Sequence, residues 1–122
     1  MKKTSNSEYI VMQAFWDAGK ALNRYEIAER VNNAPYNQTW EVGTVSTFVS
    51  RLNAKGLLDF ERIDKINRYF PTVGRKEYIQ TIINQKLQDV FRTDFEKLFL
   101  AYADVEINDE NLKKLKDFMD EI

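Results

Sequence analysis

The segment from Trp40 to Gly56 places the strongest constraint on the fold, because its apolar residues recur with the period of one helical face. The apolar positions are Val45, Phe48, Val49 and Leu52. Their i, i+3, i+4, i+7 spacing is that of a helix that buries one side. Gly56 closes the run, and glycine favours the left-handed conformation in which helices commonly end. The spacing therefore predicts a helix that packs on one side and ends at Gly56.

The opposite face of this predicted helix carries small polar and cationic side chains and no acid. Its members are Gly43, Thr44, Ser46, Thr47, Ser50, Arg51 and Lys55. Short side chains allow a helix to approach base edges in the major groove, and cations suit the neighbouring phosphates. Two interpretations fit this face: a DNA-reading helix, or a core helix with a sparsely charged outer side.

Two capping boxes predict two short helices before this segment. Ser5 and Glu8 form the first, and Asn23 and Glu26 form the second, each with a carboxylate three residues after the capping side chain. Gly19 is expected to end the first helix. The expected buried residues are Val11, Met12, Phe15 and Trp16 in the first helix, and Ile27, Ala28 and Val31 in the second.

A β-hairpin is predicted after Gly56. Residues 57–63 and 66–70 are two β-prone runs, separated by the polar pair Asp64-Lys65. This pair contains no glycine, so the type of turn stays open. Three helices followed by a hairpin is the order of a winged helix-turn-helix domain, and we expect it to span residues 1–74. The predicted fold class is mainly α with a small β-wing.

Three cations, Arg62, Lys65 and Arg68, gather on the predicted wing. On a wing, such residues can hold the phosphate backbone that flanks the groove. A solvated turn is the equally acceptable alternative.

Residues 75–122 change in character and predict a helical domain of three helices. Its large apolar residues exceed what so small a unit can bury by itself, so we expect it to form a homodimer. Folding back on its own winged helix is the alternative. The predicted dimerisation residues are Ile79, Ile83, Leu87, Phe91, Phe95, Leu98, Phe99, Tyr102, Leu112, Leu115, Phe118 and Met119.

Composition excludes several classes of function. Cysteine and histidine are both absent, which removes the usual nucleophile–base pairs and transition-metal ligands. We therefore predict no enzyme, no metal and no cofactor. No apolar run reaches the length of a membrane span, so a cytoplasmic protein is expected. The net charge of −1 divides into +4 for residues 1–76 and −5 for residues 77–122, so a local cationic surface remains compatible with nucleic acid.

A set of motifs extends over nearly the whole chain. Its members are the segment Glu8-Tyr-Ile-Val-Met12 with Trp16; Trp40, Thr44-Val-Ser-Thr47, Arg51-Leu52 and Lys55-Gly56; Asp64-Lys65-Ile66 with Tyr69-Phe70; and, towards the C-terminus, Phe95, Leu98, Leu100, Glu110 and Leu115. This pattern resembles the penicillinase-repressor family of bacterial transcriptional regulators, of the BlaI/MecI/CopY type.

The resemblance implies a winged-helix domain, a C-terminal three-helix dimerisation module, and repression by a homodimer bound to palindromic double-stranded operator DNA. It implies that Thr44, Ser46, Thr47, Ser50 and Arg51 face the groove. The residues that it implies at the DNA backbone are Arg24, Tyr25, Lys55 and Arg68. Lys65 is added to this set because of its place among the cations of the predicted wing. The competing hypothesis is a winged-helix adaptor that binds protein rather than DNA, with Phe60, Tyr69 and Phe70 as its apolar anchor.

The sequence departs from the family pattern in three respects. Residues 41–43 are Glu-Val-Gly where many members have Ser-Pro-Lys, which removes one phosphate contact and adds an acid. The cysteine cluster of copper-responsive members is absent. Ala101-Tyr102 stands where β-lactam-responsive members are cleaved at an Asn–Phe bond. Because this pair differs from the cleaved bond, the resemblance does not carry the protease route over to this chain. A sensor-linked protease and other inducers both stay open.

Overall fold

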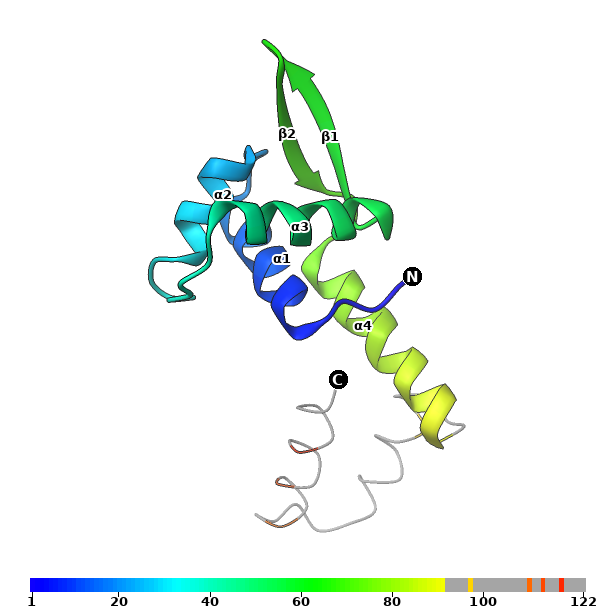
Figure 1. The fold of residues 1–122 in the computed structure, drawn as a ribbon. Coiled ribbons are helices and arrows are strands. Elements are labelled where there is room, and N and C mark those ends of the chain that lie inside the picture. Colours follow the sequence, from blue (N-terminus) through cyan, green and yellow to red (C-terminus); the bar gives the residue numbers. More distant parts are fainter. Residues whose placement is uncertain (92–96, 98–109, 111–112, 114–116, 118–122) are drawn as a thin grey trace. The chain divides into compact units, whose positions relative to one another are not determined.

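The computed structural model describes residues 1–91 together with Lys97, Glu110, Lys113 and Asp117. The chain divides into two compact units, residues 1–75 and 76–122. The first unit contains helices α1 (Asn6–Ala18), α2 (Arg24–Val31) and α3 (Val42–Ala54), followed by strands β1 (Leu58–Ile63) and β2 (Ile66–Pro71). This order confirms the predicted mainly α fold with a small β-wing (Figure 1).

Both predicted capping boxes are present. In α1, the Ser5 hydroxyl accepts the Glu8 amide at 3.2 Å, and the Glu8 carboxylate accepts the Ser5 amide at 3.0 Å. In α2, Asn23 Oδ1 accepts the Glu26 amide at 2.9 Å, and Glu26 Oε1 accepts the Asn23 amide at 3.0 Å. Gly19 ends α1 with a φ of 65°, a left-handed conformation that glycine adopts without strain. The two capping boxes thus fix where the helices begin, and Gly19 fixes where α1 ends.

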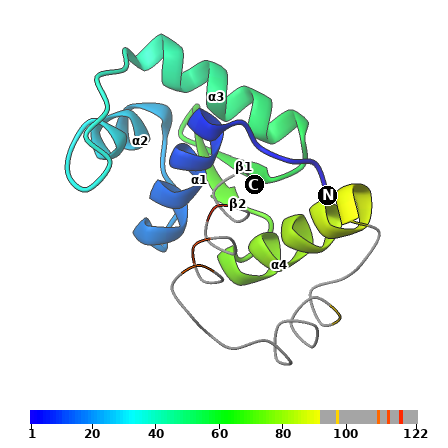
Figure 2. The same ribbon diagram turned by 90° about the horizontal axis from the view of Figure 1, so that it is seen from below.

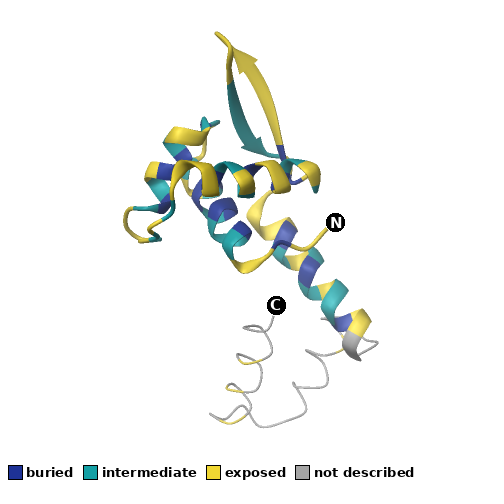
Figure 3. Cartoon of the chain, in the orientation of Figure 1, coloured by how far each residue is buried: buried dark blue, intermediate teal, exposed yellow. Residues whose placement is uncertain are grey.

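The core of the first unit lies between the three helices, and α3 runs along its outer edge (Figures 2 and 3). Its buried side chains include Val11, Met12, Phe15, Leu22, Ile27, Val31, Val45, Val49, Leu52, Leu57 and Leu58. Trp16 is only half-buried, and its indole N–H donates to the Val73 carbonyl at 2.9 Å. Phe48 is also half-buried and packs edge-to-face on Trp40, with ring centroids 5.0 Å apart. The predicted apolar faces of α1 and α3 are therefore present, but Trp16 and Phe48 lie at the edge of the core instead of inside it.

The wing, which we define as residues 58–71, is one antiparallel hairpin paired from Leu58↔Pro71 to Ile63↔Ile66. Asp64 and Lys65 have φ values of 52° and 65°. Positive φ at both central residues is the mark of a type I′ turn, whose twist matches that of the strands. The turn forms without the glycine that usually occupies it.

A second contact joins the wing to the helices. Leu22, in the segment between α1 and α2, forms an isolated antiparallel bridge with Tyr69. The Leu22 amide donates to the Tyr69 carbonyl at 2.9 Å, and the Tyr69 amide donates to the Leu22 carbonyl at 2.8 Å. These two bonds hold the base of the wing beside α2.

Helix α4 (Arg75–Lys86) continues into a π-helical turn, Leu87–Phe91. The spacing of apolar residues does not distinguish these two hydrogen-bond patterns, so the sequence did not reveal the change. Tyr78, Ile82 and Leu87 are buried, whereas Ile79 and Ile83 are half-buried.

Candidate nucleic-acid interface

The outer face of α3 is open to solvent along its length. Thr44, Thr47, Ser50 and Arg51 are exposed, and Ser46 is half-buried. The Thr47 hydroxyl donates to the Gly43 carbonyl one turn earlier, at 3.1 Å, so its oxygen lone pairs remain available as acceptors. The structure thus presents the predicted groove-facing residues outward, with Ser46 closest to the core.

Arg51 is the cation of this outward face and lies in the last turn of α3. In the part of the chain from residue 1 to residue 91, no hydrogen bond or ion pair engages its guanidinium. A planar guanidinium carries five donors and suits the paired acceptors of a guanine edge or a phosphate. As far as residues 1–91 are concerned, Arg51 can therefore bind an external acceptor without first breaking an internal contact.

Lys55, in contrast, is bound within the fold. Its ammonium group pairs with the Glu8 carboxylate and also donates to the Lys3 carbonyl at 3.0 Å. Glu8 is only 2% exposed, so Lys55 supplies the compensating charge that a buried carboxylate requires. The ion pair ties the C-terminal end of α3 to the beginning of α1.

The balance of interactions at Glu8 favours its charged form. Burial by itself would raise the pKa of this carboxyl group, but the hydrogen bonds from Lys55 and from the Ser5 amide outweigh burial and lower it. Glu8 thus acts both as a helix cap and as the partner of Lys55. The sequence displayed the first role through the capping box and gave no sign of the second.

The wing also divides its cations between internal and external positions. Arg68 pairs with Glu26 of α2 at 3.0 Å, and Arg62 donates to Asn67 across the hairpin at 3.2 Å. Lys65 projects from the type I′ turn, and among residues 1–91 it has no ion-pair partner. Of the three cations predicted on the wing, Lys65 is available, whereas Arg68 is paired with Glu26 and Arg62 donates to Asn67.

A concave surface lies between the beginning of α2 and the wing. Its volume is about 260 Å³, and it is lined by Asn23, Arg24, Tyr25, Arg62, Lys65, Ile66, Asn67 and Tyr69. The Arg24 guanidinium lies over the Tyr25 ring, 5.6 Å from its centroid, and both residues are exposed. Arg62 belongs to this surface, although the resemblance did not place it at the DNA.

The apolar anchor of the adaptor hypothesis is only partly exposed. Phe60 is 42% exposed and packs against Tyr69 across the hairpin, with ring centroids 5.5 Å apart. Tyr69 and Phe70 are half-buried.

Four of the twelve predicted dimerisation residues lie in α4 or in the π-helical turn that follows it. Ile79 and Ile83 are half-buried on α4 and Leu87 is buried. The Phe91 side chain and the remaining positions lie outside the described residues: Phe95, Leu98, Phe99, Tyr102, Leu112, Leu115, Phe118 and Met119.

No helix among the described residues has the length and apolar character that spanning a bilayer requires. Within the same part of the chain, no three carboxylate, imidazole or thiol side chains come together as metal ligands would.

Several known proteins are similar to this chain in sequence or in structure. Methicillin resistance regulatory protein MecI is 21% identical over 117 residues in both Mammaliicoccus sciuri and Staphylococcus aureus (strain N315), covering 94% of this chain and 91% of MecI. The solution structure of the DNA-binding domain of the repressor BlaI is 27% identical, with a TM-score of 0.53, and covers 64% of this chain and 94% of that domain. Monomeric BlaI of Bacillus licheniformis, solved in complex with the blaP half-operator, is 25% identical with a TM-score of 0.52 over 63% of this chain and 89% of that one.

The sequence profile described as penicillinase repressor matches residues 4–121, nearly the full length. These relatives are repressors and regulatory proteins, in agreement with the prediction that the chain is not an enzyme. The chain belongs to the penicillinase repressor family.

Proposed function

We propose that this protein is a dimeric transcriptional repressor that binds a palindromic operator, with α3 in the major groove and the wing on the flanking backbone. Family membership supports the general role of a DNA-binding repressor. The similarity to BlaI solved in complex with a half-operator, which covers 63% of this chain, supports the same role.

The observation that carries this proposal is the outward face of α3. Thr44, Thr47, Ser50 and Arg51 are exposed side by side on one helix that carries no acid. Hydroxyl groups can donate to or accept from any base edge, and arginine binds the O6 and N7 acceptors of guanine in pairs. A helix with an unpaired arginine among short polar side chains is therefore suited to reading bases.

The concave surface between α2 and the wing is the proposed seat of the DNA backbone. Arg24, Tyr25, Arg62 and Lys65 present three cations and a phenol there. Phosphate contacts of this kind fix the register of the protein on the duplex without reading sequence. We assign Lys55 and Arg68 a positioning role instead, because each is paired with an acid on another element.

Dimerisation through residues 75–122 completes the proposal. Two winged helices related by a twofold axis would meet two half-sites of an operator. Sedimentation velocity of the full chain should give twice the mass of a single chain. A monomer at the concentrations that saturate DNA would contradict the dimeric part.

The test of DNA binding begins by selecting the tightest duplex from a random-sequence pool and measuring its affinity by fluorescence anisotropy. For wild type, log K should fall linearly with log salt, by about 0.9 for each phosphate neutralised. Arg51→Ala should weaken the selected duplex by about 1–3 kcal/mol. Lys76→Ala, which removes an exposed cation from α4, is the matched control and should not.

The adaptor hypothesis predicts a different outcome in the same experiment. Selection would then enrich no sequence, and any residual binding would not respond to Arg51→Ala. Under this hypothesis, Phe60→Ala would instead weaken the binding of a protein partner, measured by capture of that partner.

A further inference from the structure

A cavity of about 540 Å³ lies between the end of α1, helix α2 and the loop that follows α2, apart from the outer face of α3 and the wing surface. Its lining residues are Asp17, Lys20, Leu22, Glu26, Glu29, Arg30, Asn33, Ala34, Pro35 and Tyr36. This volume falls within the range of small-molecule sites, roughly 300–1,000 Å³. None of these residues belongs to the proposed DNA-reading face of α3.

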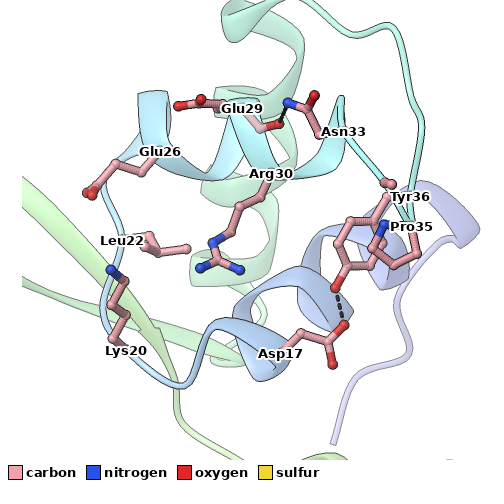
Figure 4. Close-up of a pocket in the computed structure, with 10 residues that line it drawn as sticks. Asp17, Lys20, Leu22, Glu26, Glu29, Arg30, Asn33, Pro35 and Tyr36 are labelled. Carbon is pink, nitrogen blue, oxygen red and sulfur yellow. Dashed lines mark hydrogen bonds between the residues drawn. The ribbon is translucent and has the colours of Figure 1, made fainter.

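Arg30 is the side chain aimed into this cavity. Figure 4 shows it extending from α2 towards the space between Leu22 and Tyr36. It is half-buried, and no hydrogen bond or ion pair within residues 1–91 engages its guanidinium. The charge of Arg30 also acts on Asp17 and Tyr36, but within residues 1–91 its guanidinium forms no hydrogen bond with either of them. Its planar donors can therefore bind a carboxylate in pairs.

Two of the three acids in the lining are already bound by cations from outside the cavity. Asp17 accepts hydrogen bonds from Arg75 and Tyr36, and those bonds lower the pKa of its carboxyl group. Glu26 caps α2 and pairs with Arg68.

The charges left facing the cavity are Arg30 and Lys20 against the Glu29 carboxylate, a balance of +1. That balance suits one negative charge. A phosphate monoester, with a charge of about −1.5 to −2 at neutral pH, would be overcharged for the site.

The rest of the lining combines apolar residues with the Asn33 amide and the Tyr36 ring. Leu22 is 1% exposed, and Ala34 and Pro35 of the loop complete the apolar part of the lining. A ligand that fits both parts has a carboxylate at one end and a hydrocarbon or aromatic body at the other. Apolar walls with a few placed polar groups are the usual form of a small-molecule site.

We propose that this cavity binds a small organic monocarboxylate, with Arg30 and Lys20 holding the carboxylate and Leu22, Ala34 and Pro35 holding the apolar body. The site does not depend on the proposed DNA-binding function. It borders the loop that leads to α3, so an occupant would contact the segment immediately before the DNA-reading helix.

The experiment is a titration of the nitrogen-15-labelled full chain with sodium benzoate and sodium hexanoate, followed by heteronuclear NMR at constant ionic strength. Both carboxylates should give saturable shifts at the amides of Lys20, Arg30, Asn33 and Tyr36, with a Kd on the order of 1 mM. Benzamide, the neutral counterpart of benzoate, and inorganic phosphate should each bind at least about tenfold more weakly.

Arg30→Gln should weaken benzoate about tenfold, and Lys20→Gln should weaken it by a smaller factor. Lys76→Gln removes the same charge outside the cavity and should leave the Kd unchanged. The proposal is overturned if neither carboxylate shifts these amides up to about 20 mM. Equal binding of benzamide, saturation by phosphate alone, or an unchanged Kd in Arg30→Gln would overturn it as well.

Discussion

The cations of the winged-helix unit fall into two regions that the fold treats in opposite ways. Between the elements, Lys55, Arg68 and Arg75 are each paired with an acid from a different part of the chain. On the outward side, Arg51 and Lys65 have no such partner within residues 1–91. The comparison shows that position in the fold, rather than residue type, decides which cations are available to a nucleic acid.

The reason for the difference is the location of the acids. Glu8, Glu26 and Asp17 lie on α1 and α2, and each meets a cation brought to it from α3, the wing or the segment after the wing. Helix α3 has no acid of its own, so a cation on its outer side finds no local partner. Lys55, which directly follows the last residue of α3, is the exception because its side chain reaches Glu8 of α1.

The largest effect that would break or sharpen this comparison is expected from Lys55→Met. This change keeps the apolar stem but leaves the buried Glu8 carboxylate without its cation. An unpaired buried charge should cost about 2–3 kcal/mol of unfolding free energy, and the loss is not larger because Lys55 itself is partly exposed. Arg51→Met, the matched change on the outward side, should cost less than about 0.5 kcal/mol. Urea denaturation measures both, and equal losses would remove the distinction between the two regions.

The next largest effect is expected at the tip of the wing. Lys65→Gly should raise stability by about 0.5–1 kcal/mol, because glycine accepts the positive φ of the type I′ turn without strain. The same change should reduce the salt slope of DNA binding by about 0.9, since one phosphate contact is lost.

Lys65→Asn is the control for this prediction. It removes the same charge and tolerates positive φ, so its salt slope should match that of Lys65→Gly with a smaller gain in stability. A salt slope equal to that of wild type in both variants would exclude Lys65 from the interface.

A smaller effect is expected from Arg68→Ala. The Arg68–Glu26 pair is partly exposed on both sides, and such pairs contribute about 0–1 kcal/mol to stability. Because Arg68 is already paired, its removal should leave the salt slope of DNA binding nearly unchanged. A drop in slope by about 0.9 would show instead that Arg68 leaves Glu26 and binds phosphate.

The smallest effect is expected from pH. The folded-state pKa of Glu8 is lowered from its usual 4.5, so its contribution to stability is present above pH 4.5 and is lost as the pH falls through the lower folded value. Glu8→Gln should remove that part of the acid dependence. Urea midpoints at about pH 4 and about pH 7 test this, and identical acid losses in both proteins would contradict it.

Much of the fold could be predicted because its determinants are local. The capping boxes at Ser5 and Asn23 and the left-handed glycines Gly19 and Gly56 fixed the ends of helices within a few residues of sequence. The period of Val45, Phe48, Val49 and Leu52 likewise gave the correct inner side of α3, and with it the outward side.

The pairings could not be predicted, because they join residues far apart in the sequence. Lys55 and Glu8 are separated by 47 positions and Arg68 and Glu26 by 42. Each of these four residues has a local role that is visible in sequence, as a cap or as a cation in a basic run. Only the packed structure shows that they pair with one another, and these pairs are the reason why we propose positioning roles for Lys55 and Arg68.

The central claim, that Arg51 of α3 reads a base in the major groove, is best tested by a double-mutant cycle with the selected duplex. Replacing a guanine of one half-site with 7-deazaguanine deletes the N7 acceptor and leaves the minor groove intact. At the guanine that Arg51 contacts, wild type should lose about fivefold or more in affinity, while Arg51→Ala should lose nothing further. If every 7-deazaguanine duplex weakens Arg51→Ala by the same factor as wild type, Arg51 does not read guanine and the account is wrong.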